Sequence, residues 1–309
     1  MSKKLWQPSL IVKKNSNLFA FENYISKKLK IKFNRNYKKL LNWSIKNSPE
    51  FWSRFWDFSK IKGIKSNKKF RKSKTFYKNL FLPGSRLNFG ENLLSKNNNE
   101  KAVTFISENG FREERSWRQL NLNTNKISKF LKKINIKKGD RVAAYMPNTI
   151  ETVEAFIATT SLGGIWSSCS PDFGSKGVIE RFSQINPKVL FITDQYFYNG
   201  KKIDILNRLP EILKLIPSIK SVVISNYPGK KFIKNKYKFK KINFFKWNKL
   251  MQTNAEKINF KRFDFETELA ILYSSGTTGK PKCICHRSGG VLIQHMKEHQ
   301  LHCNIKEND

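Results

Sequence analysis

The sequence has few cysteines, no long apolar run and no recognisable leader peptide. Its four cysteines, Cys169, Cys283, Cys285 and Cys303, are too few and too irregularly spaced among 309 residues for a disulfide framework. The longest apolar stretches are interrupted by Thr, Ser and Gly before they reach the roughly 18 residues that a membrane span needs. The basic start of the chain lacks an apolar core and a small-residue cleavage site. We therefore expect free thiols, no membrane partner and a cytoplasmic location.

Acidic residues are also scarce. The 23 Asp and Glu face 60 Lys and Arg, which gives a formal net charge of +37 at pH 7. The cations are spread along the chain rather than gathered in one arm, and Lys outnumbers Arg, the side chain that pairs with guanine through two hydrogen bonds. We therefore expect no specific nucleic-acid partner; a basic nucleic-acid-binding protein is the alternative, and its affinity would fall steeply with salt. Residues 227–249, where Lys is interleaved with Phe and Tyr, are the best candidate for a basic patch, but we expect an exposed loop and an edge strand there.

The first 97 residues predict a mainly helical region. Ser48, followed by Pro and Glu, predicts a helix start with Ser48 as the N-cap. The aromatic side chains within residues 51–56 recur at helical spacing, so they predict one core face. Residues 82–94 predict a loop that leads into a short helix, and an Asn-rich stretch follows it. We interpret residues 1–97 as an amino-terminal region and 98–309 as a second, incomplete domain.

After residue 100 the pattern alternates between strands and helices. A hairpin is expected around Asn109-Gly110, and Ser116 and Gln119 have the spacing of a capping box at the start of a helix. Strands are predicted at 141–146, 164–169, 188–194 and 219–225, and helices at 151–162, 176–184 and 202–215. Such repeated strand–helix–strand units predict an α/β fold with a parallel sheet flanked by helices, with ligands beyond the carboxyl ends of the strands.

One loop carries the composition of a polyphosphate cradle. A predicted strand at 268–273 runs into the sequence YSSGTTGKPK, residues 273–282. Glycines let backbone N–H groups converge on an anion, hydroxyls add donors, and lysines add positive charge. The spacing is not that of the Walker pattern, and no G-x-G-x-x-G occurs in the chain. A Ser/Thr/Gly-rich surface turn is the simpler alternative for such a composition.

These ten residues resemble the phosphate-binding signature of the acyl-adenylate-forming, or AMP-binding, superfamily. GDRVAAYMPN at 139–148 and ATTSLGG at 158–164 resemble two further segments of that superfamily. Residues 82–94 (LPGSRLNFGENLL) and 167–173 (SSCSPDF) are similar to its acetoacetate–CoA ligase branch. The resemblance covers essentially the whole chain and implies the acyl-adenylate-forming fold, here cut off after the phosphate loop, with ATP, Mg²⁺, CoA and acetoacetate or another short acid as cofactors and substrates.

The resemblance also assigns site residues. The ATP phosphates would be bound by Ser274, Ser275, Gly276, Thr277, Thr278, Gly279 and Lys282, whereas Lys280 occupies a variable position. Residues 198–201 resemble a CoA-contacting Arg-Gly-Gly-Lys segment, so Gly200 and Lys201 are candidate CoA contacts. Tyr198 and Asn199 depart from that segment, and a plain turn is the alternative.

The resemblance places the adenine and acyl pockets, the Mg²⁺-binding Thr-Glu pair and the catalytic lysine later in sequence than residue 309. We therefore expect a fragment that contains no catalytic residue and is inactive alone. An acetyl-CoA or other short-chain acyl-CoA synthetase and a non-catalytic nucleotide-binding remnant are the alternatives. Cys283, Cys285 and His286 precede three further histidines, but neither H-E-x-x-H nor C-x-x-C is present, so no metal site is predicted.

Overall fold

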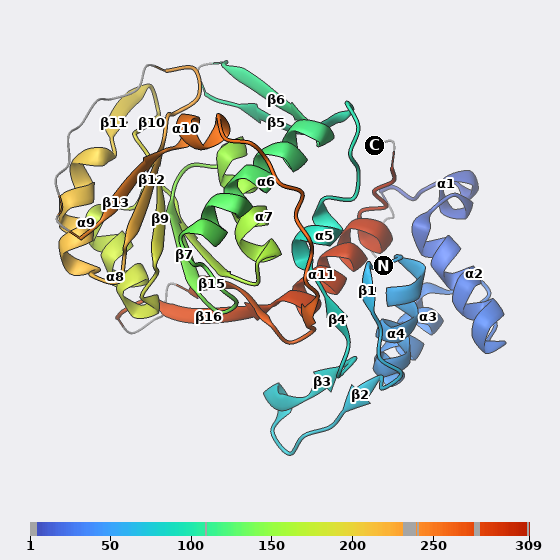
Figure 1. The fold of residues 1–309 in the computed structure, drawn as a ribbon. Coiled ribbons are helices and arrows are strands. Elements are labelled where there is room, and N and C mark those ends of the chain that lie inside the picture. Colours follow the sequence, from blue (N-terminus) through green and yellow to red (C-terminus); the bar gives the residue numbers. More distant parts are fainter. Residues whose placement is uncertain (1–4, 109, 231–238, 240, 275–278, 308) are drawn as a thin grey trace. The chain divides into compact units, whose positions relative to one another are not determined.

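The computed structural model describes residues 5–108, 110–230, 239, 241–274, 279–307 and 309 (Figure 1). The chain divides into two compact units. Unit 1 comprises residues 1–87, 264–266 and 288–309, and unit 2 comprises residues 88–263 and 267–287. The domain boundary after residue 97 stays a prediction.

Unit 1 is built from short helices and very short strands. Its helices are α1 (Leu10–Lys14), α2 (Asn17–Leu29), α3 (Tyr37–Lys46), α4 (Ser48–Phe58), the 3₁₀ turn η1 (Phe76–Lys78), α11 (Ser288–Lys297) and the π-helix η3 (Glu298–His302). Its strands are β1 (Gly63–Ile64), β2 (Phe70–Arg71), β3 (Leu80–Phe81) and β4 (Arg86–Leu87), and β14 (Phe263–Asp264) crosses the boundary between the units.

The mainly helical structure predicted for the first 97 residues ends at Phe58, the last residue of α4. Short strands follow it. Gly63 lets β1 approach β4 closely, because a Cβ on Gly63 would lie 2.7 Å from the carbonyl oxygen of Arg86.

Aromatic rings form the core of unit 1. The ring of Phe21 lies 5.6 Å from Phe51, 5.7 Å from Phe55 and 5.1 Å from Phe58, each in an edge-to-face arrangement. Phe55 and Trp56 are buried, which confirms the predicted core face of this helix. The predicted N-cap is wrong by one residue. Helix α4 already includes Ser48, and its N-cap is Asn47. Asn47 is the only residue between α3 and α4, so it is also the C-cap of α3.

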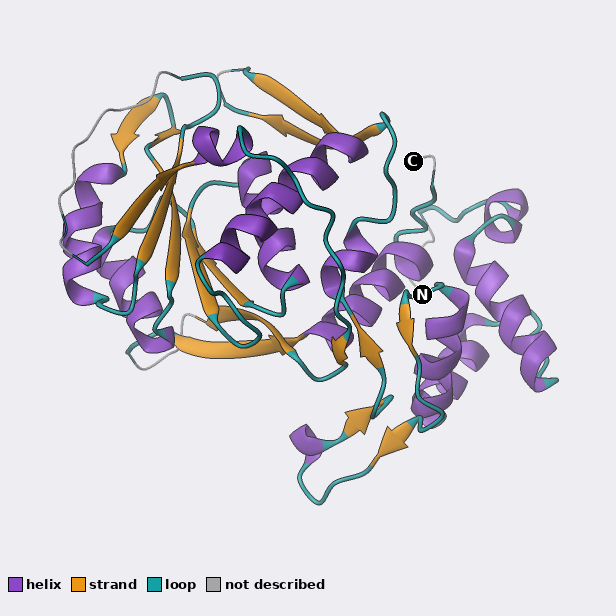
Figure 2. Ribbon diagram, viewed as in Figure 1, coloured by secondary structure: helices purple, strands orange, loops and turns teal. Residues whose placement is uncertain are grey.

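Unit 2 contains a seven-stranded sheet in the order β13-β12-β9-β7-β8-β15-β16 (Figure 2). These strands are β7 (Arg141–Tyr145), β8 (Ile165–Cys169), β9 (Val189–Thr193), β12 (Ser221–Ser225), β13 (Asn243–Lys246), β15 (Glu268–Ser274) and β16 (Lys282–Arg287). All neighbours in the sheet are parallel except β15 and β16, which are antiparallel. The predicted parallel sheet is confirmed, and β13 is the edge strand expected within residues 227–249. Residues 231–238 and 240 of that segment lie outside the described residues.

Helices cover both faces of this sheet (Figure 1). They are α5 (Phe89–Leu93), α6 (Trp117–Lys133), α7 (Ile150–Ser161), α8 (Ser175–Ile185), α9 (Leu209–Leu215) and α10 (Trp247–Met251), with a 3₁₀ turn, η2 (Leu206–Arg208). Leu190 of β9 packs in one core cluster with α8 and α9. Its neighbour Phe191 points to the opposite face, where its ring lies 6.1 Å from Trp247 of α10. Every side chain of β9 is therefore buried, as in a sheet covered on both sides.

Two hairpins stand beside the sheet. One joins β5 (Lys101–Ile106) to β6 (Arg112–Ser116), as predicted, and Ser116 and Gln119 form the expected capping box. The other joins β10 (Gln195–Tyr198) to β11 (Lys201–Asp204). The helix predicted over 202–215 is therefore wrong in its first part. Asn199 and Gly200 both have positive φ, 50° and 71°, so the chain turns back as a hairpin and becomes helical only after Asp204.

None of the helices within the described ranges is long and apolar enough to cross a membrane. All four cysteines are free thiols, and Cys169 is buried whereas the other three are exposed.

Candidate functional site

The predicted phosphate loop connects the antiparallel strands β15 and β16. Ser274 and Lys282 lie opposite each other as the last pair of the β15–β16 ladder, so the structure brings these two predicted residues together. Gly279 is exposed and has φ of +114°, a conformation that favours glycine. The remaining predicted residues, Ser275, Gly276, Thr277 and Thr278, lie outside the described residues. Lys280 is exposed.

Both ends of this loop are tied to helix α8. The hydroxyl of Tyr273 donates to the carbonyl of Arg181 at 3.2 Å and accepts from the Ser167 hydroxyl at 3.2 Å. At the other end of the loop, the carbonyl of Pro281 accepts from the Gln184 side-chain amide at 2.9 Å. Burial raises the pKa of Tyr273, so its hydroxyl keeps its proton and its donor role at neutral pH. The loop therefore starts and ends at fixed points on one helix.

A cleft of about 610 Å³ opens at the carboxyl ends of β7 and β8. The helices that follow these strands, α7 and α8, lie on opposite faces of the sheet (Figure 1). At such a switch of direction an α/β sheet leaves a crevice, which is where ligands bind in this class of fold. The cleft is lined by Thr104, Phe105, Ile106, Ser107, Glu108, Met146, Pro147, Asn148, Thr152, Ser168, Cys169, Ser170, Asp172, Tyr196, Phe197, Tyr198 and Tyr227.

The chemistry of the cleft suits binding rather than covalent catalysis. Tyr196 and Tyr198 stack with ring centroids 6.1 Å apart, and Tyr227 meets Tyr196 edge-on. Burial, together with the nearby carboxylate of Asp172, raises the pKa of Tyr196 to about 12. Burial also raises the pKa of the Cys169 thiol to about 12, which keeps it from acting as a thiolate nucleophile. The cleft thus offers flat aromatic surface and neutral hydroxyl donors.

A partly buried hydrogen-bond network supports the segment 171–173 next to this cleft. The Tyr145 hydroxyl donates to the carbonyl of Phe173 at 2.5 Å and accepts from the guanidinium of Arg208. Arg208 also donates to the carbonyls of Pro171 at 3.0 Å and Phe173 at 2.8 Å. These bonds hold the segment that carries Asp172 into the cleft. Sequence reasoning missed this network, because Tyr145 and Arg208 are 63 residues apart and neither belongs to a local motif.

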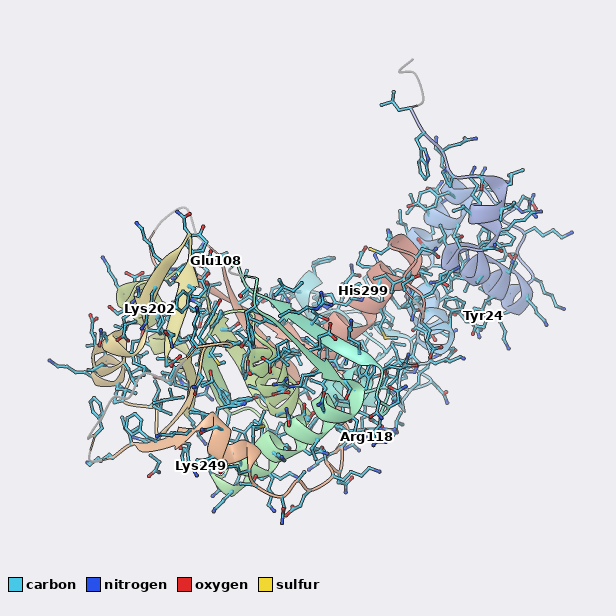
Figure 3. All side chains as sticks on the ribbon, turned by 90° about the horizontal axis from the view of Figure 1, so that it is seen from above. Tyr24, Glu108, Arg118, Lys202, Lys249 and His299 are labelled. Carbon is cyan, nitrogen blue, oxygen red and sulfur yellow. The ribbon has the colours of Figure 1, made fainter. Side chains whose placement is uncertain are left out.

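The candidate CoA residues belong to a different hairpin from the phosphate loop. Gly200 forms the β10–β11 turn, and Lys201 is exposed at the start of β11. The backbone N–H groups of Asn199 and Gly200 donate to the Glu108 carboxylate at 2.7 and 3.0 Å. Figure 3 shows Glu108 above Lys202, next to this hairpin. The Glu108 carboxylate therefore occupies the place where the N–H groups of this turn would bind an anion. The sequence did not predict this contact, because Glu108 belongs to the separate hairpin expected around Asn109-Gly110.

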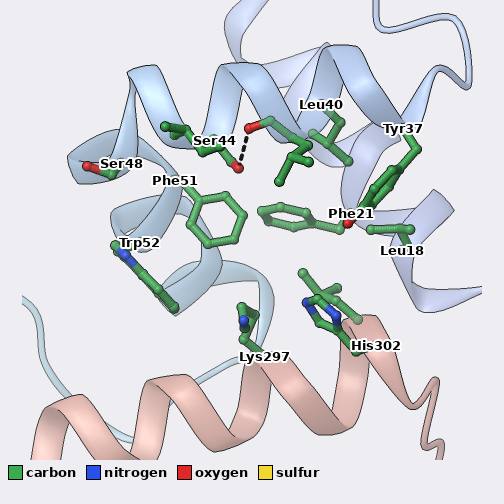
Figure 4. Close-up of a pocket in the computed structure, with 13 residues that line it drawn as sticks. Leu18, Phe21, Tyr37, Leu40, Ser44, Ser48, Phe51, Trp52, Lys297 and His302 are labelled. Atoms are coloured by element: carbon green, nitrogen blue, oxygen red, sulfur yellow. Dashed lines mark hydrogen bonds between the residues drawn. The ribbon is translucent and has the colours of Figure 1, made fainter.

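A second cavity, of about 320 Å³, lies within unit 1 (Figure 4). Phe21, Leu40, Phe51 and other apolar side chains of α2, α3 and α4 line one side. Lys297 and His302 point into it from the opposite helix (Figure 4). Sequence reasoning assigned no site here, because its lining comes from segments more than 200 residues apart.

Metal ligands do not come together in the part of the chain that the structure describes: no three His, Cys, Asp or Glu side chains there could hold a metal ion. Cys283 and Cys285 lie exposed on the edge strand β16.

Comparisons with known proteins agree with the geometry. The AMP-binding enzyme family matches residues 92–308. An acetoacetyl-CoA synthetase from Xenopus tropicalis is 37% identical over 100% of this chain, which spans 46% of that protein. An acetoacetyl-coenzyme A synthetase from Rhizobium meliloti (strain 1021) is 35% identical over 99% of this chain, again with 46% of its own length covered. A malonamoyl-CoA synthetase from Penicillium aethiopicum is 32% identical over 99% of this chain, which covers 43% of it.

A solved structure supports the same relationship. The acetoacetyl-CoA synthetase from Streptomyces lividans superimposes with a TM-score of 0.89 at 28% sequence identity, and covers 98% of this chain and 46% of its own. The chain therefore has the acyl-adenylate-forming fold, as predicted, and spans about half the length of these relatives.

Proposed function

The chain belongs to the AMP-binding enzyme family, and on that premise we propose that it serves in the ATP-dependent ligation of acetoacetate to CoA. In this reaction the acetoacetate carboxylate attacks the α-phosphate of ATP, which gives acetoacetyl-AMP and pyrophosphate. The CoA thiol then attacks the acyl carbon, which gives acetoacetyl-CoA and AMP. The similarity of the whole chain to acetoacetyl-CoA synthetases of an animal and a bacterium is the observation that carries this proposal.

The loop between β15 and β16 would bind the ATP phosphates. Lys282 and Ser274 flank the point where the loop leaves and rejoins the sheet. A lysine ammonium and preset hydroxyl and N–H donors stabilise the charge that develops on the pyrophosphate leaving group. Ser275, Gly276, Thr277, Thr278 and Gly279 complete this proposed cradle. Its support is the family match together with the position of the loop after a parallel strand.

We propose that CoA binds along the β10–β11 hairpin and the cleft at the carboxyl ends of β7 and β8. Lys201 is exposed beside Gly200, and its ammonium is free to approach a CoA phosphate. We propose Lys201 rather than the turn N–H groups as the phosphate donor, because those N–H groups already bind Glu108. The aromatic side chains of the cleft offer flat surface to a base.

The acid substrate would be a short carboxylate with a carbonyl group on its third carbon. Acetoacetate and malonamate, the acids in the names of the relatives, share this feature and differ only in a methyl against an amino group. Mg²⁺ would accompany ATP. The described residues provide no carboxylate cluster for the ion, so no step is assigned to it. We also propose a cytoplasmic location.

The test is acetoacetate-dependent exchange of labelled pyrophosphate into ATP, measured on the product of the complete gene. Acetoacetate should support faster exchange than acetate, with malonamate as the closest competitor. Equal exchange with acetate would redirect the proposal to another short acid. ATP binding without exchange for any acid would contradict the ligase function and favour a nucleotide-binding remnant.

A further inference from the structure

The β2–β3 hairpin of unit 1 carries an unusual concentration of positive charge. Residues 60–87 contain ten Lys and Arg and no Asp or Glu. Lys65 and Lys69 form ion pairs with Asp57 and Glu50. Exposed cations with no ion-pair partner among the described residues surround the hairpin turn: Lys68, Arg71, Lys72, Lys74 and Lys78. This excess of charge is local and uncompensated.

Two aromatic rings stand in the middle of these cations. Phe76 is 88% exposed and Tyr77 is 74% exposed, and both belong to the 3₁₀ turn η1 at the end of the hairpin. A phenylalanine ring that is nearly fully in water has no structural role in the fold. Neighbouring aromatic rings of this kind, exposed together, mark an interaction surface.

The turn that presents the rings is ordered by hydrogen bonds. Backbone N–H groups of Lys78 and Asn79 donate to the carbonyls of Thr75 and Phe76 at 2.9 and 3.1 Å. The Asn79 side chain accepts from the Ser73 N–H at 2.8 Å, across the loop. At the base, the rings of Phe70 and Phe81 lie 5.0 Å apart. The rings are therefore held outward before any partner arrives, which lowers the entropy cost of binding.

We propose that this hairpin binds the surface of an anionic phospholipid membrane. The lysines would neutralise lipid headgroups while Phe76 and Tyr77 enter the boundary between headgroups and acyl chains. Such a contact is peripheral and requires no membrane-spanning helix, but it departs from the expectation that the chain has no membrane partner. It is independent of the ligase function, because the hairpin lies outside both the phosphate loop and the cleft.

Single-stranded nucleic acid fits this surface less well. Nucleic-acid-binding modules place aromatic rings on a platform or in a groove where successive bases stack. Here the two rings are sequence neighbours on one tight turn, and they line neither of the two unit 1 cavities that helices α1 to α4 help to form. Only Arg71 among the five cations offers the planar guanidinium that stacks on bases.

Vesicle sedimentation of the 309-residue protein tests the proposal. Vesicles of phosphatidylcholine with about one third phosphatidylserine should bind the protein at ~0.1 M salt, and pure phosphatidylcholine should not. Replacing Lys72, Lys74 and Lys78 together by Gln should weaken binding about 100-fold. Replacing Phe76 and Tyr77 together by Ser should weaken it about 10-fold without changing net charge. Circular dichroism and the melting temperature confirm that each variant is folded.

The matched control removes the same charge from elsewhere in unit 1. Replacing exposed Lys27, Lys28 and Lys39 of α2 and α3 together by Gln should weaken binding less than about 3-fold. An equal loss in the control and hairpin variants would overturn the proposal, because the binding would then follow diffuse charge. Absence of vesicle binding would also overturn it. So would a hairpin-dependent shift of a 20-nucleotide RNA that exceeds the affinity for vesicles, which would assign the surface to nucleic acid.

Discussion

Ser274 and Lys282 face each other across the last pair of the β15–β16 ladder, at the carboxyl edge of the sheet in unit 2. Seven residues join these two positions, and we propose that this connection binds the ATP phosphates. Tyr273 and Pro281 anchor the two sides of this loop to helix α8. The proposed phosphate cradle therefore starts and ends at fixed points on this helix.

Arg208 holds the segment 171–173 next to the cleft, so its loss should destabilise unit 2. Arg208→Met leaves the buried Tyr145 hydroxyl and two carbonyls without a charged donor. We expect the free energy of unfolding to fall by about 1–3 kcal/mol. Urea denaturation measures this, with Arg118→Met at an exposed position as the control. Equal stabilities for the two variants would contradict the assigned role.

Glu154 makes stability depend on pH. Its carboxyl is buried on α7, and burial outweighs the Arg115 guanidinium 3.5 Å away, raising the pKa from 4.5 to about 8. Between these values the folded state holds a proton that the unfolded state has lost, so stability falls as pH rises from about 5 to 8. The slope should approach ~1.4 kcal/mol per pH unit. Glu154→Gln should reduce this slope markedly but not abolish it, because burial also raises the pKa of the neighbouring Glu151. Glu256→Gln at an exposed site should retain the slope. An unchanged slope in the Glu154→Gln variant would refute this explanation.

Gly90 permits the close contact between α5 and α7. A Cβ at this position would lie 2.0 Å from the Ser161 hydroxyl oxygen and 3.2 Å from the Ile157 carbonyl oxygen. Gly90→Ala should therefore lower the free energy of unfolding by about 1–3 kcal/mol. Gly290→Ala, where a Cβ meets nothing within 4 Å, should leave the melting temperature unchanged or slightly higher. The reverse order of melting temperatures would contradict the packing.

Glu108 fixes the turn that carries the candidate CoA residues. Glu108→Ala removes the acceptor of the Asn199 and Gly200 N–H groups. We expect amide hydrogen exchange at these two positions to accelerate about 10-fold or more, because the protected state loses its hydrogen bonds. Exchange in β9, the buried strand, should not change and serves as the internal control. Unaltered exchange at the turn would show that Glu108 does not hold it.

The sequence predicted much of the sheet because its signals are local. Ser116 and Gln119 form the capping box through contacts three residues apart, and the buried strands read as apolar runs. The helix predicted over 202–215 is wrong only in its first part, where residues 201–204 form β11, and its second part is helix α9. The turn residues Asn199 and Gly200 were a hairpin signal, but the helical spacing of the following residues was extended back across that strand. The Tyr145–Arg208 network could not be predicted, because the fold alone brings these distant residues together.

The sequence predicted the phosphate loop but not the lining of the cleft, because only the loop has a local signal. A ten-residue signature predicts the phosphate loop, and its role stays a prediction. The structure adds that Ser274 and Lys282 pair, that Gly279 has positive φ, and that Tyr273 and Pro281 bond to helix α8. The cleft at the ends of β7 and β8 has no such signature. Its lining comes from separate loops, and only the general rule for parallel sheets indicated where it would lie.

ATP affinity, measured by equilibrium dialysis on matched lysine variants, tests the central claim most directly. Lys282 belongs to the proposed cradle and Lys280, two residues away, does not, although both are exposed and carry the same charge. Lys282→Gln should weaken ATP binding about 10–100-fold, the effect of losing a charged hydrogen bond, and Lys280→Gln should change it less than about 2-fold. Equal effects of the two substitutions, or ATP binding that neither alters, would contradict the assignment of this loop to the ATP phosphates.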